Sequence, residues 1–229
     1  ALSAASEYFV TDAKKITLLP DTMSYNQGAM IEPLAVTVHA VKRAGDVTGM
    51  KIAVLGAGPI GNLMAQTAKS LGAEAVMITD ISDYRLSLAK DCGIDYCINT
   101  KNEDFGEAMV RDFGPDKADV IIDCAGNNIT MGQAIRYARK GSVIILVAVF
   151  ADMATVDLAV LNDHELDLNT SMMYRHEDYV EAIRLASAGT VKLDPLMTRH
   201  FTFRDYLDAY HYIDENRERT MKVLIDVHP

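Results

Sequence analysis

A glycine-rich turn between an apolar run and an amphipathic segment constrains the fold of this chain most strongly. The apolar run at residues 51–55 is bounded by glycine, which predicts a short buried strand of a parallel sheet. Glycines follow at positions 56, 58 and 61. Beyond them a helix is predicted that ends at Gly72, because apolar residues recur at helical spacing, at Ile60, Leu63, Met64, Ala68 and Leu71.

Strand and helix patterns then alternate along the chain. Further strands are predicted at residues 75–80, 96–99, 118–124, 143–147 and 166–172. Helices are predicted between them, at residues 82–93, 103–113 and 129–139. This alternation predicts an α/β fold with a doubly wound parallel sheet and right-handed crossovers, the Rossmann architecture.

The two ends of the chain fall outside this alternation. Residues 1–33 hold strand-like pieces at 7–10 and 16–19 and a turn at Pro20-Asp21. After the sixth strand we expect a helix at 179–188, a strand at 196–203, a helix at 204–215 and a last strand at 222–227. Neither end has enough elements to form a complete domain of its own.

In a dinucleotide-binding site, each glycine of this turn has a distinct physical role. Gly56 permits the tight turn, Gly58 lets the backbone approach a pyrophosphate, and Gly61 allows the helix to pack close to the strand. The helix that starts at Pro59 offers phosphates the free N–H groups of its first turn, from Ile60 onward, and a partial positive charge. The alternative is a turn that packs a strand on a helix and binds nothing.

An acidic residue completes this pattern. Asp80 ends the next predicted strand, 19 residues beyond Gly61. At this position a carboxylate accepts hydrogen bonds from both hydroxyls of an adenosine ribose and repels a 2′-phosphate. The sequence therefore predicts NAD rather than NADP, with a solvated loop carboxylate as the alternative role of Asp80.

The topology of a doubly wound sheet also predicts the place of the nicotinamide. Ligands lie across the carboxyl ends of the strands, where the strand order reverses. This points to Cys124, Ala125 and Gly126 after the fourth strand, and to Val147, Ala148 and Val149 after the fifth. Ordinary exits from a strand into a loop are the alternative for both segments.

Charge and cysteine usage exclude several classes of function. The net charge of −10 argues against a nucleic-acid partner, because phosphate binding needs clustered Lys and Arg. There is neither an apolar run long enough to span a membrane nor a signal-peptide pattern. The three cysteines, Cys92, Cys97 and Cys124, form no CxxC pair, which indicates reduced thiols and a cytoplasmic location.

Several segments together resemble one family. They are residues 28–35 (GAMIEPLA), 38–40 (VHA), 56–61 (GAGPIG), 178–183 (DYVEAI), 195–201 (PLMTRHF) and 221–225 (MKVLI). In this combination and order the chain resembles the zinc-dependent medium-chain dehydrogenases, in particular the branch that acts on polyols such as sorbitol (L-iditol) and xylitol. The resemblance covers nearly the whole chain. It implies hydride transfer between a secondary alcohol and NAD.

The resemblance also implies individual cofactor contacts. It assigns NAD contacts to Gly58, Pro59, Ile60, Asp80 and Arg85, of which Arg85 is expected to reach the adenosine side or else to be an exposed helix arginine. It further implies that the segments 147–149 and 172–174, the latter with Met173 and Tyr174, pass the nicotinamide end of the cofactor.

The metal half of the family pattern is largely missing from this sequence. The resemblance implies that Glu32, in the Glu-Pro pair, descends from the catalytic zinc site, where a carboxylate suits a metal that keeps one position open. The other ligands of the family are a cysteine, a histidine and a glutamate from an N-terminal catalytic domain. No Cys precedes Cys92, there is no Gly-His-Glu motif, and His39 lies in an apolar helical run, where a packed helix residue is the expected role.

We therefore expect a piece of a polyol-type dehydrogenase that binds NAD but does not oxidise alcohols unaided, with zinc only in the longer enzyme. In this interpretation residues 1–33 are the tail of a GroES-like catalytic domain, 34–175 form the NAD-binding domain, and 176–229 close it. A non-catalytic NAD-binding sensor or scaffold is the alternative, while a methyltransferase is disfavoured because the resemblance continues to the C-terminus. The family further implies a homo-oligomer, a dimer or tetramer formed through edge strands.

Overall fold

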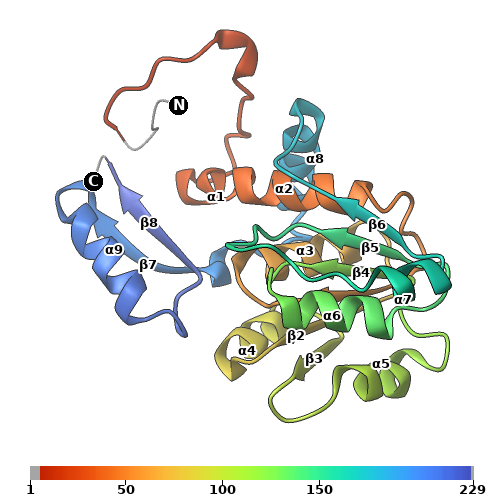
Figure 1. Cartoon of the computed structure of the whole chain (residues 1–229). Coiled ribbons are helices and arrows are strands. Elements are labelled where there is room, and N and C mark those ends of the chain that lie inside the picture. The colour runs from red at the N-terminus through yellow and green to blue at the C-terminus, as the bar shows by residue number, and fades with distance from the viewer. Residues whose placement is uncertain (1–5, 228–229) are drawn as a thin grey trace.

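The computed structural model describes residues 6–227, and its centre is one parallel sheet (Figure 1). The sheet runs in the order β3-β2-β1-β4-β5-β6. Its strands are β1 (Lys51–Leu55), β2 (Ala75–Asp80), β3 (Tyr96–Asn99), β4 (Val120–Asp123), β5 (Val143–Leu146) and β6 (Asp167–Thr170). Every neighbouring pair is parallel, which confirms the doubly wound prediction. The order reverses between β1 and β4.

Helices cover both faces of this sheet (Figure 1). One face carries α2 (Ile31–Lys42), α3 (Pro59–Ser70) and α4 (Asp83–Asp91), and the other carries α5 (Phe105–Phe113), α6 (Asn128–Tyr137) and α7 (Leu158–Asp163). The sequence predicted the ends of α3, α4, α5 and α6 to within about two residues. It contained no signal for the short α7. Ser82 caps α4 as expected, its hydroxyl accepting the Arg85 N–H.

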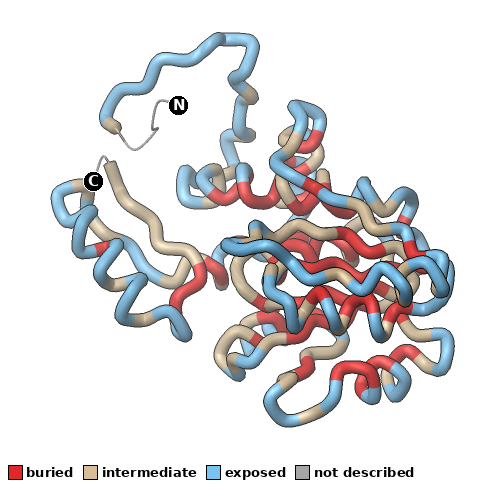
Figure 2. Tube along the Cα trace, viewed as in Figure 1, coloured by how far each residue is buried: buried red, intermediate tan, exposed pale blue. Residues whose placement is uncertain are grey.

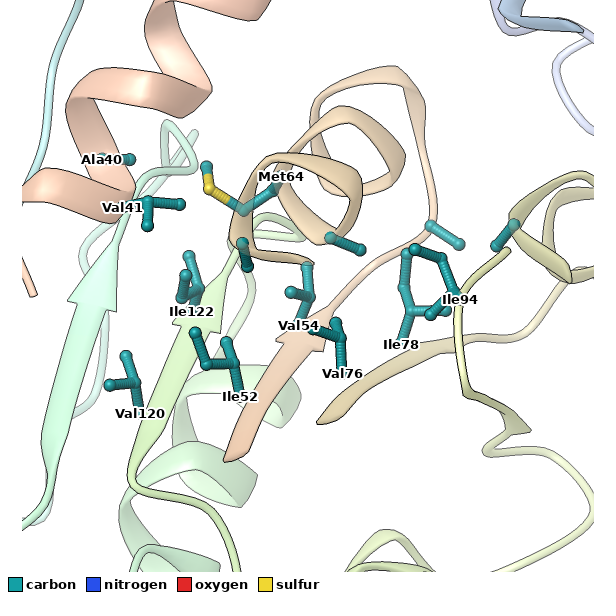
Figure 3. Close-up of a cluster of buried hydrophobic side chains, with 14 of the residues drawn as sticks. Ala40, Val41, Ile52, Val54, Met64, Val76, Ile78, Ile94, Val120 and Ile122 are labelled. Atoms are coloured by element: carbon teal, nitrogen blue, oxygen red, sulfur yellow. The ribbon is translucent and has the colours of Figure 1, made fainter. Parts of the chain in front are cut away.

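The core follows from the alternation of side chains along each strand. Ile52 and Val54 of β1 point to the α2–α4 face, while Ala53 and Leu55 point to the α5–α6 face. All four are fully buried. Figure 3 shows the first of these clusters, in which side chains from β1, β2 and β4 meet Met64 of α3 and Val41 of α2. Near-continuous apolar strands are therefore required by a sheet that is covered on both faces.

The N-terminal segment corrects two predictions. Residues 7–10 and 16–19 are not strands: the chain is irregular there, apart from a 3₁₀ turn, η1 (Ala13–Lys15). Tyr8, Val10 and Leu18 are each more than four-fifths exposed (Figure 2), and the segment belongs to neither of the described sheets. An isolated strand has no ladder to hold it, so β propensity alone is not enough. The predicted turn is confirmed, with the Met23 N–H donating to the Pro20 carbonyl.

The C-terminal elements form a small unit beside the main sheet. After α8 (His176–Ser187) and a 3₁₀ turn, η2 (Asp194–Leu196), come β7 (Met197–Thr202), the turn η3 (Phe203–Asp205), α9 (Tyr206–Glu215) and β8 (Lys222–Asp226). β7 and β8 pair in parallel as a separate two-stranded sheet with α9 against it. In Figure 1 this unit, drawn in blue, lies to one side of the Rossmann body. The four predicted elements are confirmed.

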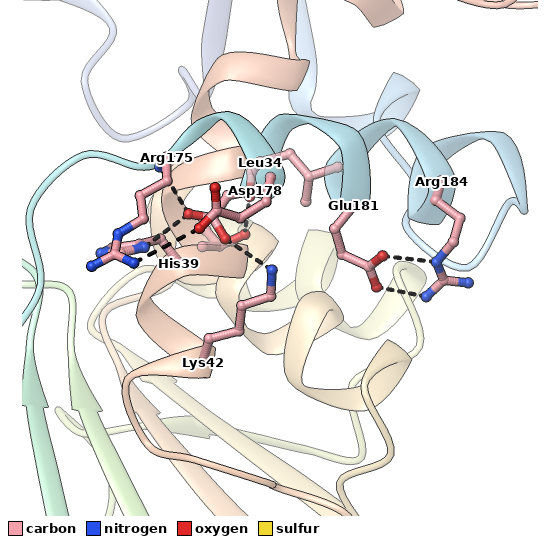
Figure 4. A network of polar contacts seen from close by, with 9 residues as sticks. Leu34, His39, Lys42, Arg175, Asp178, Glu181 and Arg184 are labelled. Atoms are coloured by element: carbon pink, nitrogen blue, oxygen red, sulfur yellow. Dashed lines mark hydrogen bonds and ion pairs between the residues drawn. The ribbon is translucent and has the colours of Figure 1, made fainter.

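A buried carboxylate joins α8 to α2, as Figure 4 shows. Asp178 is 1% exposed. Its Oδ1 accepts a hydrogen bond from Lys42 Nζ at 2.9 Å, and its Oδ2 accepts the Arg175 N–H at 2.9 Å and lies 2.8 Å from His39 Nδ1. His39 is therefore hydrogen-bonded as well as packed. Burial raises the pKa of Asp178, but the bonds from Lys42, Arg175 and His39 outweigh it and hold the pKa below its usual value.

This balance predicts a pH-dependent contribution to stability. A carboxyl group whose pKa is lowered by folding stabilises the protein above its unfolded pKa of about 3.9, and this contribution is lost as the pH falls through the folded pKa. We expect Asp178→Asn to lower the free energy of unfolding at pH 7 by about 1.5–3 kcal/mol, the range for hydrogen bonds to charged groups. Urea denaturation at pH 7 and below pH 4 measures the effect. The difference between variant and native protein should shrink at low pH, and parallel curves would contradict the prediction.

Candidate functional site

The three glycines of the turn at residues 56–61 meet three different environments. Gly56 has φ +97°, a conformation that side chains rarely adopt. A Cβ on Gly61 would lie 1.7 Å from the carbonyl oxygen of Gly56, so the start of α3 touches the end of β1. Gly58 has φ −63°, and a Cβ there would meet nothing within 4 Å. Packing and backbone geometry thus require Gly56 and Gly61, but neither requires Gly58.

The N-terminus of α3 faces the open space beside Gly58. Gly58 is its N-cap and Pro59 its first residue, and no described side chain caps it. The amides of the first turn therefore remain available to an anion, and the helix dipole adds a partial positive charge. Residues 56–61 lie at the carboxyl edge of β1, next to the reversal of strand order between β1 and β4.

Asp80 is tied to the glycine turn. Its Oδ2 accepts the Ala57 N–H at 2.7 Å, and its Oδ1 accepts the N–H groups of Ile81 and Ser82 at 2.8 and 2.9 Å. Arg85 Nη1 lies 3.9 Å from Oδ2. These contacts hold the carboxylate in place, and Oδ2 keeps an acceptor site for a hydroxyl group.

A cleft of about 380 Å³ lies beside Asp80. Ser82, Arg85, Lys101, Arg217 and Arg219 are among its lining residues. Arg85 is anchored, because its Nη2 donates to the Arg217 carbonyl at 2.8 Å. The sequence predicted Arg85 on this side, whereas it gave no signal for Lys101, Arg217 or Arg219. Arg217 and Arg219 belong to the loop between α9 and β8. This loop is distant from β2 in the sequence, but the fold places it beside Asp80 at the end of β2.

A second cleft, of about 390 Å³, lies on the other side of the glycine turn. We call it the β4–β6 cleft. Its lining comes from α2 and α3 and from the ends of β4, β5 and β6: Val36, Ile60, Cys124, Ala125, Val147, Ala148, Val149, Ser171, Met172 and Met173. The structure thus brings together Ile60, the segment after β4 and residues 147–149. The sequence did not single out Val36 or Ser171.

A buried carboxylate shapes the loop after β4. Asp123 is fully buried, and its Oδ1 accepts the N–H groups of Ala125 and Gly126. Burial raises its pKa more than these bonds lower it. Gly126 has φ +69°, and a Cβ there would lie 2.6 Å from the Cβ of Ala148. The loops after β4 and β5 therefore fit together only with glycine at this position.

Two predicted residues lie elsewhere. Tyr174 does not line the β4–β6 cleft but a neighbouring one, where its ring packs edge-on against Tyr179 at 4.8 Å between centroids. Glu32 is an exposed residue in the first turn of α2. Among residues 6–227 no group of three or more His, Cys, Asp or Glu side chains is arranged to hold a metal ion. The described residues thus do not supply a zinc site around Glu32.

The cysteines do not add nucleophilic chemistry. All three are unpaired. Burial raises the pKa of Cys97 to about 11 and raises the pKa values of Cys92 and Cys124 as well. At neutral pH the thiols are therefore protonated, including Cys124 in the wall of the β4–β6 cleft.

Comparisons with known proteins agree with this geometry. The chain is 31% identical to sorbitol dehydrogenase 1 of Saccharomyces cerevisiae over 225 residues, covering 96% of this chain and 63% of that protein. A solved alcohol dehydrogenase of Escherichia coli CFT073 in complex with NADH has a TM-score of 0.86 and 26% identity, covering 95% of this chain and 64% of that one. L-idonate 5-dehydrogenase of Escherichia coli K-12 has a TM-score of 0.83 and 26% identity, covering 91% and 59%.

The chain thus spans less than two thirds of the length of these relatives. Among the described helices, none combines the length and the apolar character needed to cross a membrane. A family model described as zinc-binding dehydrogenase matches residues 59–188, which is more than half of the chain. The chain therefore belongs to the zinc-binding dehydrogenase family.

Proposed function

We propose that this chain binds NAD along the carboxyl edge of its sheet. In this proposal the adenosine lies in the cleft beside Asp80, the pyrophosphate at the glycine turn and the start of α3, and the nicotinamide in the β4–β6 cleft. One observation carries the proposal: Gly58 lacks a side chain where neither its backbone angles nor its neighbours require that. Space kept free at a helix N-terminus suits a phosphate that approaches the backbone closely.

We further propose that the whole protein transfers a hydride between a secondary alcohol or a polyol and NAD. The nicotinamide, when bound, supplies the hydride acceptor. The residues of this chain bind and orient it: Asp80 accepts a ribose hydroxyl, the first amides of α3 hold the pyrophosphate, and the apolar walls of the β4–β6 cleft exclude water from the ring. Zinc, with Glu32 among its ligands, belongs to the proposal only for the longer protein.

We propose a cytoplasmic location, which the three unpaired cysteines support. The domain division at residues 1–33, 34–175 and 176–229 is also a proposal, and α2 runs unbroken from Ile31 to Lys42 across its first boundary.

Calorimetric titration of the chain with NAD and with NADP tests the cofactor. We expect NAD to bind more tightly, because a 2′-phosphate would meet the Asp80 carboxylate. An assay with sorbitol or xylitol, NAD and zinc should show no turnover by residues 1–229 alone, since the described residues hold no metal cluster. Tighter binding of NADP, or robust oxidation of either polyol, would contradict these expectations.

Gly58→Ala separates a ligand role from a packing role. The methyl group fits the free protein, so the melting temperature should stay within a few degrees, whereas it should obstruct the pyrophosphate and weaken NAD binding at least about tenfold. Gly61→Ala is the matched control, because its methyl group clashes with the Gly56 carbonyl and should lower the free energy of unfolding by about 1–3 kcal/mol. Equal NAD affinity of Gly58→Ala and the native chain argues against the proposed site.

We also propose self-association through β6, one of the two edge strands of the main sheet. Its side chains Leu168 and Asn169 are only half-buried, so a second copy of the strand has backbone and side-chain surface to pair with. Size-exclusion chromatography with light scattering should give a dimer or tetramer. A monomer at all concentrations would rule this out.

A further inference from the structure

The β4–β6 cleft contains a buried hydroxyl group without a partner. Ser171 is only 6% exposed, and no described atom forms a hydrogen bond with its Oγ. Its backbone is fixed, since the Ser171 N–H donates to the Leu146 carbonyl at 2.9 Å and continues the β5–β6 ladder. A buried hydroxyl that makes no hydrogen bond destabilises the protein, so its presence needs a reason.

The surroundings of Ser171 suggest that reason. The other lining residues of the cleft are alanine, valine, isoleucine, methionine and one protonated cysteine. Ser171 is therefore the strongest hydrogen-bonding side chain among the described residues of this wall. An amide that entered so apolar a cleft would lose its bonds to water and needs at least one replacement.

A second serine provides an internal comparison. Ser142 is also buried, at 1% exposed, and its Oγ is likewise without a partner among the described residues. It precedes β5 at the opposite end of the sheet and is not among the lining residues of the cleft. The two serines therefore share their chemistry and burial but differ in access to the proposed site.

We propose that Ser171 Oγ binds the carboxamide group of the nicotinamide ring. This inference rests on the proposed NAD site and assigns the polar contact within it. The carboxamide is the only hydrogen-bonding group of the ring, and fixing it selects which face of the ring is turned to a hydride donor. The contact requires Oγ to turn from the wall toward the cleft, by rotation about the Cα–Cβ bond of Ser171 between staggered positions.

The test compares Ser171→Ala, Ser142→Ala and the native chain by calorimetric titration with NAD and with ADP-ribose, which lacks the nicotinamide. Ser171→Ala should weaken NAD binding about three- to tenfold, as expected for one hydrogen bond, and leave ADP-ribose binding unchanged. Ser142→Ala should change neither. Without ligand, both variants should melt at or above the native temperature, because each removes a buried unpaired hydroxyl.

A third ligand, 3-acetylpyridine adenine dinucleotide, identifies the direction of the bond. It keeps the carbonyl but lacks the amide N–H, so an unchanged affinity in Ser171→Ala means that Oγ accepts from the amide, and a weakened one means that Oγ donates to the carbonyl. Equal loss of NAD and ADP-ribose affinity, or no loss of either, overturns the role of Ser171 while the NAD site stands. If the native chain binds neither NAD nor ADP-ribose, the proposed function and the inference both fail.

Discussion

The contact between the start of α3 and the end of β1 determines most of what this structure can do. Only hydrogen fits between Gly61 and the Gly56 carbonyl, so the helix begins directly over the carboxyl edge of the strand. This places the uncapped first turn of α3 at the point where the strand order reverses. From there the cleft beside Asp80 extends to one side and the β4–β6 cleft to the other. A larger residue at Gly61 would push the helix away from the strand, and one at Gly56 would crowd the loop at Ala125.

Much of the fold could be predicted because local and global signals agree within the Rossmann body. Its strands are apolar runs and its helices end near glycines, and several of these glycines, such as Gly72 and Gly93, have positive φ angles. The N-terminal segment was the exception. Its sequence favours strands at residues 7–10 and 16–19, but a strand exists only when a neighbour supplies the ladder, and sequence periodicity does not contain that information.

Part of the candidate site could also be predicted from the sequence. Gly56, Asp80 and residues 147–149 follow from the position of a loop relative to a strand, which a sequence reveals. Arg217, Arg219 and Ser171 do not, because their relevance depends on where a distant loop or a strand end comes to rest. Ser171 in particular is an ordinary serine in the sequence. Only its burial and the missing partner of its Oγ distinguish it.

The bond between Asp80 and the Ala57 N–H has a consequence for changing the cofactor. The same carboxylate that would discriminate against a 2′-phosphate also supports the backbone that would receive the pyrophosphate. A basic replacement at position 80, chosen to admit NADP, has no acceptor atom and would therefore leave the Ala57 amide unpaired and loosen the turn. Cofactor preference and phosphate binding are not independently adjustable in this chain, so a successful exchange needs a second substitution that restores an acceptor for Ala57.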